Sequence, residues 1–129
     1  MYTFTNIKEK SKVKYLGKND SGQILELTMD EWYYLNSSHW YVCFEIKNKR
    51  KHEFKYRQQV GKDGLKSLLW AKYCLVDFIN NHLDNNKDNV IIVQWDDSKR
   101  KRAYVRFLSE VGFKLTVIDR RPSLILKIK

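Results

Sequence analysis

The chain has 129 residues, which is enough for one hydrophobic core and too short for two domains of ordinary size. Hydrophobic residues make up 43% and aromatic residues 14%, and one proline with five glycines gives little sign of disorder. The 25 lysines and arginines exceed the 15 acidic residues, and the resulting charge of +10 attracts phosphates, nucleic acid or acidic protein surfaces, or serves only solubility. We therefore expect one folded, basic domain over residues 1–129.

The N-terminal segment interleaves lysines with apolar residues and contains no continuous apolar stretch. This pattern is typical of a solvated edge strand, and it predicts neither a signal peptide nor a membrane-spanning helix. Cys43 and Cys74 each lie in an apolar stretch without a CxxC motif. We expect two free buried thiols in a reducing, cytoplasmic compartment, and no membrane association.

Residues 23 to 60 indicate strands interrupted by one short helix. Gln23 to Leu27 is compatible with a short strand, and Thr28 followed three residues later by Glu31 is a capping-box signal for a short helix. From His39 to Val60, apolar and polar residues alternate on both sides of a polar turn at 48–50. Period-two alternation predicts a β-hairpin with one buried face.

The second half predicts two helices and three strands. Apolar residues from Leu65 to Leu83 recur at spacings of three, four and seven, which predicts a long central helix. Val90 to Val93 is apolar on both faces, as in a buried parallel strand. Ser98 to Val111 predicts a second helix, and a closing hairpin follows at 113–118 and 124–128. The expected fold is α/β (α+β), with a mixed, mostly antiparallel sheet and the two helices on opposite faces.

A glycine turn stands immediately before the long helix. Such a turn exposes backbone N–H groups, and the partial positive charge of a helix N-terminus favours phosphate there. Asp63 in the same turn repels phosphate, and a simple helix cap is the alternative interpretation. The candidate phosphate-binding residues are Gly61, Lys62, Gly64, Leu65 and Lys66.

This segment resembles the Gln/Arg-x-x-Gly-x-Gly/Ala turn of GNAT-type N-acetyltransferases. Gln58, Gly61 and Asp63 fit one register of that pattern, and Gly61, Gly64 and Lys66 fit the other. The later segments are also similar to the strand, helix and Gly-Phe ending of the family, through Val90 to Trp95, then Asp97-x-x-Arg100-x-x-Ala103-Tyr104, then Val111-Gly112-Phe113. The resemblance covers about residues 52 to 129, and it implies a GNAT-like sheet flanked by helices.

The resemblance further implies that an acetyl group is transferred from acetyl-CoA to an amine of a protein or a small molecule. Glu45 and Glu53 on the predicted hairpin are candidates for the base that accepts the amine proton. Many members place a thiolate-protonating tyrosine four residues before the Gly-Phe glycine, where this chain has Leu108. Tyr104, one turn earlier, is the remaining candidate, and a role in the core is the alternative.

A basic cluster at the start of the second helix opposes the helix dipole, so it needs compensation by neighbouring aspartates or by an anionic ligand. A run that is only solvated is equally compatible with this pattern, because consecutive residues point around a helix. The cluster is a candidate for binding nucleic acid or an acidic protein, and it consists of Lys99, Arg100, Lys101, Arg102 and Arg106.

Aromatic residues from Trp32 to Tyr41 interleave with the basic hairpin, a combination that binds single strands or forms an ordinary core. Leu108 in place of the acid, Asp63 in the turn and the charge of +10 favour the alternative function, a catalytically inactive GNAT-like domain that binds nucleic acid or an acidic protein through its basic surface. His39, His52 and His82 are far apart in sequence and form no HxxxH or HExxH motif, so no metal site is expected.

Overall fold

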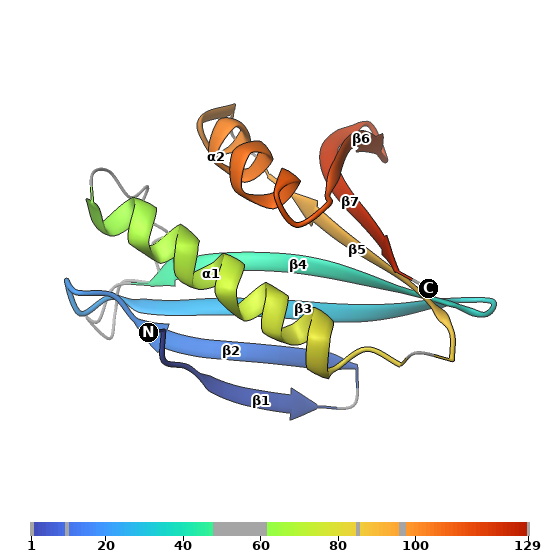
Figure 1. Ribbon diagram of the computed structural model, residues 1–129, viewed down its shortest axis with the longest axis horizontal. Helices are drawn as coiled ribbons and strands as arrows, with labels where there is room; N and C mark the ends of the chain where they lie inside the picture. The colour runs from blue at the N-terminus through green and yellow to red at the C-terminus, as the bar shows by residue number, and fades with distance from the viewer. Residues whose placement is uncertain (1, 10, 48–61, 85, 96–97, 129) are drawn as a thin grey trace.

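The computed structural model describes residues 2–9, 11–47, 62–84, 86–95 and 98–128, with residues 62–64 and 98–100 described by their backbone alone. These residues form one sheet and two helices (Figure 1). The elements in chain order are β1 (Thr5–Glu9), β2 (Lys12–Lys18), β3 (Ile24–Tyr34), β4 (Ser37–Lys47), α1 (Lys62–Asn81), β5 (Asp88–Gln94), α2 (Ser98–Ser109), β6 (Lys114–Ile118) and β7 (Arg121–Ile128). Both predicted helices and the three strands of the second half are confirmed.

The strands of the described residues form one mixed sheet in the order β1-β2-β3-β4-β5-β7-β6. Every neighbouring pair is antiparallel except β4 and β5, which are parallel. The predicted mixed, mostly antiparallel sheet is confirmed, together with the parallel pairing of the strand at Val90 to Val93. Two adjacent parallel strands need a crossover connection, and α1 provides it.

The two faces of the sheet have different environments. Side chains alternate along a strand, so the paired residues Leu27 and Phe44 share one face while Glu26 and Glu45 share the other. One hydrophobic core contains Leu27 together with Phe78 of α1 and Leu108 of α2. We call the side that both helices cover the helix face and the opposite side the open face.

The expectation that the two helices lie on opposite faces is wrong. Both lie over the helix face (Figure 1) and contribute to the same core. The reason is topological, because the connections from β4 to β5 and from β5 to β6 join parallel strands and step across the sheet in the same direction. Right-handed crossovers of this kind place their helices on the same side.

The short helix expected after Thr28 is also absent, because β3 continues as a strand to Tyr34. β3 pairs with β4 residue by residue from Ile24 opposite Lys47 to Tyr34 opposite Ser37. Leu35 in the connecting turn has a φ of 53°. The partner of β4 is therefore β3, whereas the turn expected at 48–50 lies outside the described residues.

Helix α1 packs closely against β2 at Gly17. Gly17 lies under the indole of Trp70, and a Cβ atom there would come within 2.7 Å of the ring. The Trp70 Nε1 donates a hydrogen bond of 2.9 Å to the carbonyl oxygen of Thr3. A glycine at position 17 is thus required for α1 to pack directly against β2.

The two cysteines are both free but differ in environment. Cys74 of α1 is fully buried, and burial followed by the charge of Asp77 raises the pKa of its thiol to about 12. Cys43 lies on the open face and is exposed, so the expectation of a second buried thiol is wrong.

Candidate functional site

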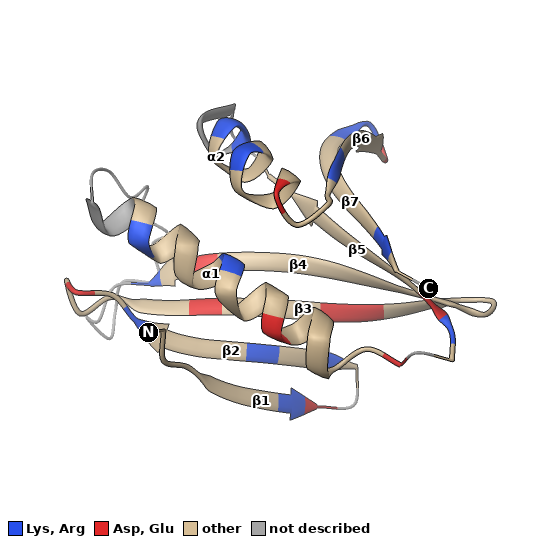
Figure 2. Cartoon of the chain, viewed as in Figure 1, with Lys and Arg blue, Asp and Glu red and all other residues tan. Residues whose placement is uncertain are grey.

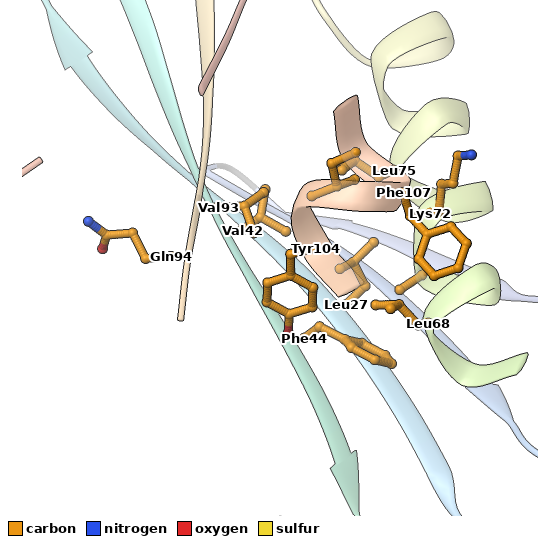
Figure 3. Close-up of a pocket in the computed structure, with 12 residues that line it drawn as sticks. Leu27, Val42, Phe44, Leu68, Lys72, Leu75, Val93, Gln94, Tyr104 and Phe107 are labelled. Atoms are coloured by element: carbon orange, nitrogen blue, oxygen red, sulfur yellow. The ribbon is translucent and has the colours of Figure 1, made fainter. Parts of the chain in front are cut away.

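A cavity of about 40 Å³ lies between α1 and α2, above the point where β4 and β5 diverge (Figure 3). The β4–β5 ladder runs from Ser37 opposite Asp88 to Val42 opposite Val93. Beyond that pair, β4 continues to Lys47, whereas β5 ends at Gln94. The end of the shared ladder forms a fork in the sheet, and its residues line the floor of the cavity.

The cavity is predominantly apolar and combines side chains from five elements. Figure 3 shows Tyr104 of α2 pointing toward Phe44 of β4, and Phe107 lying beside Lys72 of α1. Its apolar lining with a few polar groups resembles that of a small-molecule site, but its volume of about 40 Å³ is far below the roughly 300–1,000 Å³ typical of such sites. The lining residues are Leu27, Val42, Phe44, Leu68, Ala71, Lys72, Leu75, Val93, Gln94, Tyr104, Phe107 and Leu108.

Two of the polar lining residues are held by neighbours outside the cavity. The Lys72 Nζ lies 2.6 Å from Oε2 of Glu110 and 6.0 Å from the centroid of the Phe107 ring. This ammonium group holds the pKa of the Glu110 carboxyl below its ordinary value. The Nε2 of Gln94 donates a hydrogen bond of 3.1 Å to Oγ of Ser123. The cavity thus has one cation at its rim, whereas the Gln94 amide points away from the other lining side chains (Figure 3).

Tyr104 is the candidate catalytic residue that contributes to this cavity. Its side chain is buried and packs edge-on against Trp95, with ring centroids 6.0 Å apart. Leu108, one helical turn further along α2, lines the same cavity. The role in the core and the contribution to the cavity are therefore compatible, since Tyr104 has both.

Glu45 lies on the open face and not in the cavity, because it follows Phe44 on a strand whose side chains alternate. Its carboxylate is 3.6 Å from the Lys47 Nζ, and the Cys43 Sγ donates to it over 3.6 Å. Glu53, the other candidate base, lies outside the described residues.

The candidate phosphate site is described only in part. Gly61 lies outside the described residues, and Lys62 and Gly64 belong to the first turn of α1, which begins at Lys62. Leu65 is exposed, and the Lys66 Nζ pairs with Oδ2 of Asp20 at 2.9 Å. The charge of Lys66 is therefore shared with a carboxylate of the β2–β3 turn.

The basic cluster lies on α2, along which Figure 2 shows segments coloured blue for lysine and arginine. Lys99 and Arg100 belong to its first turn, and Lys101 and Arg102 are exposed on the next. The Arg106 guanidinium lies 5.6 Å from the ring centroid of Phe107. Asp96 and Asp97, the expected compensating residues, lie outside the described part of the chain.

Sequence reasoning did not identify Lys72, Gln94 or Phe107 as site residues. Lys72 could have been found, because it is a cation within the otherwise apolar pattern of α1 and lies one turn from both Leu68 and Leu75. Gln94 and Phe107 give no comparable signal, since a glutamine at a strand end and a phenylalanine in an apolar stripe are both common.

No family model, curated protein or solved structure matches the chain. No helix in the described residues is long and apolar enough to cross a membrane.

Proposed function

We propose that the chain is a GNAT-like acyl-CoA-binding domain that transfers an acetyl group from acetyl-CoA to an amine of a protein or a small molecule. The observation that supports this most directly is the apolar cavity at the fork between β4 and β5. The pantetheine arm of coenzyme A is a narrow chain of methylene and amide groups. An apolar hollow beside an extended strand has the chemical character that such a chain needs, because strand backbone groups can pair with its amides. Since about 40 Å³ is much smaller than the arm, α1 and α2 would have to move apart to admit it.

The start of α1 suits the phosphate end of the same molecule. α1 follows β4 in the chain and covers the helix face above the fork (Figure 1). Its N-terminal N–H groups and the helix dipole favour an anion. A coenzyme with its pyrophosphate at this terminus and its arm directed toward the fork would bring its thioester near Tyr104.

The proposed reaction needs one proton acceptor and one proton donor. The amine nitrogen attacks the thioester carbonyl carbon, a C–N bond forms, and the C–S bond breaks with the electron pair remaining on sulfur. The amine gives its proton to a base, for which Glu45 is the described candidate, and the thiolate takes a proton from the Tyr104 hydroxyl. Because Glu45 lies on the open face and Tyr104 on the helix face, the amine would approach through the fork from the open side.

Isothermal titration with acetyl-CoA tests the binding step. We expect saturable binding in the parent and at least tenfold weaker binding in Leu68→Trp, because the indole fills the cavity that Leu68 lines. Asn80→Trp, at an exposed position on the same helix, is the matched control and should bind as the parent does. Circular dichroism establishes that each variant is folded. Undetectable heat in the parent at near-millimolar coenzyme would refute the proposal.

A further inference from the structure

The open face carries a row of aromatic side chains at its β3–β4 end. Trp32 is 60% and Tyr34 is 56% exposed, which is unusual for side chains of this size. The Tyr34 ring lies 4.8 Å from the ring of His39, with an interplanar angle of 45°. Both helices lie on the opposite side of the sheet, so no helix of the described residues covers these rings.

Strand pairing places basic residues in line with these aromatic side chains, toward the far edge of the same face. Trp32 stands opposite His39, His39 opposite Val90, and Val90 opposite Lys127. In the adjacent row, Tyr41 stands opposite Ile92, Ile92 opposite Ile125, and Ile125 opposite Lys114. With neighbouring strands about 4.8 Å apart, the three steps from Trp32 to Lys127 span roughly 14 Å. That length accommodates about two or three nucleotides of an extended single strand.

At the β6–β7 end of the row the side-chain charges are mainly positive, which makes this end complementary to an anionic chain. Lys114 and Lys127 lie on the open face there, and Arg121 begins β7 on the same face. Asp119 in the hairpin turn is acidic, and its charge, after burial and Tyr34, raises the pKa of Tyr41. Cations therefore predominate at this end, in a chain whose overall charge is +10.

We propose that the open face binds single-stranded nucleic acid, with bases stacking on Trp32, Tyr34 and His39 and phosphates contacting Lys127 and Lys114. Every base has a π-face, so exposed rings bind single strands with little dependence on sequence. A duplex hides its base faces and would gain little from these rings. This site is separate from the proposed coenzyme site, because the sheet lies between them, and each can fail without the other.

Tryptophan fluorescence gives a direct test. Trp40, Trp70 and Trp95 are all buried, so Trp32 is the exposed indole of the four. We expect twelve-residue oligo(dT) or oligo(rU) to quench the emission of the parent in low salt, and to quench little in Trp32→Phe. Quenching that persists unchanged in Trp32→Phe would overturn the proposed stacking site.

Anisotropy with the same oligonucleotides, labelled with fluorescein, measures affinity. Trp32→Ala and Tyr34→Ala should each weaken binding about tenfold, as stacking contacts do elsewhere. Tyr33→Ala is the matched control, because Tyr33 is 64% exposed but faces the other way, where the Lys87 ammonium lies 4.3 Å from its ring centroid. Equal losses in all three variants would overturn the proposed face.

Salt dependence tests the phosphate contacts. Lys114→Gln with Lys127→Gln should reduce the log–log salt slope by about 1.4, that is about 0.7 for each lost contact to a single strand. Lys8→Gln on the exposed strand β1 should leave the slope unchanged. Binding that is lost only when Lys101 and Arg102 are replaced would overturn the proposal in favour of α2. Binding to polyglutamate without binding to either oligonucleotide would overturn it in favour of an acidic protein.

Discussion

The Tyr15 hydroxyl donates a hydrogen bond of 2.6 Å to Oδ2 of Asp77 and thereby joins the middle of β2 to α1. Tyr15 is fully buried, and the Nδ2 of Asn81 donates a second hydrogen bond of 2.8 Å to the other oxygen of the same carboxylate. Burial, followed by Asp77, raises the pKa of Tyr15 far above its ordinary value. The pair thus keeps the phenol protonated and α1 positioned over the sheet.

Replacing Tyr15 by Phe should lower the free energy of unfolding by about 1–2 kcal/mol, because a buried hydrogen bond to a carboxylate is lost. Urea unfolding measures this, and Tyr2→Phe, at an exposed position, should change stability by less than about 0.5 kcal/mol.

Because the folded-state pKa of Tyr15 is raised, its stabilising contribution is present below about pH 10 and is lost above it. The parent should therefore lose stability more steeply above pH 10 than Tyr15→Phe, and parallel pH profiles would contradict this.

Glu26 on the open face should dominate the acid sensitivity of the sheet. Burial by itself raises its pKa, but hydrogen bonds from Lys47 and from Lys14 at 3.1 Å outweigh burial and hold the pKa below its ordinary value. Because the pKa of Glu26 is lowered in the folded state, the ionised carboxylate stabilises the fold at neutral pH. This contribution is lost as the pH falls through the lowered pKa. We expect Glu26→Gln to cost about 1–3 kcal/mol at pH 7 and to flatten the pH dependence below about pH 4.5.

Asp30→Asn is the matched control for Glu26, since Asp30 lies on the same strand and face and pairs with Lys12 at 3.6 Å while remaining 43% exposed. Exposed pairs contribute little, so this variant should change stability by less than about 1 kcal/mol. Chemical denaturation at several pH values compares the two variants. A larger loss in Asp30→Asn than in Glu26→Gln would contradict the role assigned to burial.

Removing the carboxylate of Asp20, which pairs with Lys66, should strengthen coenzyme binding if the phosphate site lies at the start of α1. Asp20→Asn releases Lys66 from its 2.9 Å ion pair and removes a negative charge from that region. Because both groups are largely exposed, we expect only about a two- to threefold gain in acetyl-CoA affinity, declining with added salt. Titration calorimetry on Asp20→Asn and on Asp84→Asn, an exposed control, measures it. An unchanged affinity would remove Lys66 from the site.

Tyr104→Phe should separate catalysis from binding. The ring remains in the cavity and against Trp95, so the acetyl-CoA affinity should stay within about twofold of the parent. Loss of the hydroxyl should reduce kcat about a hundredfold or more if it protonates the thiolate. Release of free thiol from acetyl-CoA in the presence of an amine measures turnover. If the Tyr104→Phe variant turns over at the parental rate, Tyr104 has a role in the core and none in catalysis.

The sequence by itself was sufficient for the regular elements of the second half. In the apolar spacing of α1 and the uninterrupted apolar run of β5, many residues indicate the same element. Both predictions are confirmed. The signal at Thr28 and Glu31 was purely local, and the structure overrides it. Pairing along all of β3 satisfies the backbone there, and the Glu31 carboxylate instead accepts a hydrogen bond of 2.6 Å from Oγ of Ser38.

The tertiary structure alone decided where the candidate site residues lie. Both helices share one face because successive right-handed crossovers step across the sheet in one direction, which no residue pattern encodes locally. That arrangement brings Lys72 of α1 beside Phe107 of α2 and places Tyr104 in the cavity between them. Side-chain alternation along β4 then directs Phe44 into that cavity and Glu45 away from it, because neighbouring residues of a strand point to opposite faces.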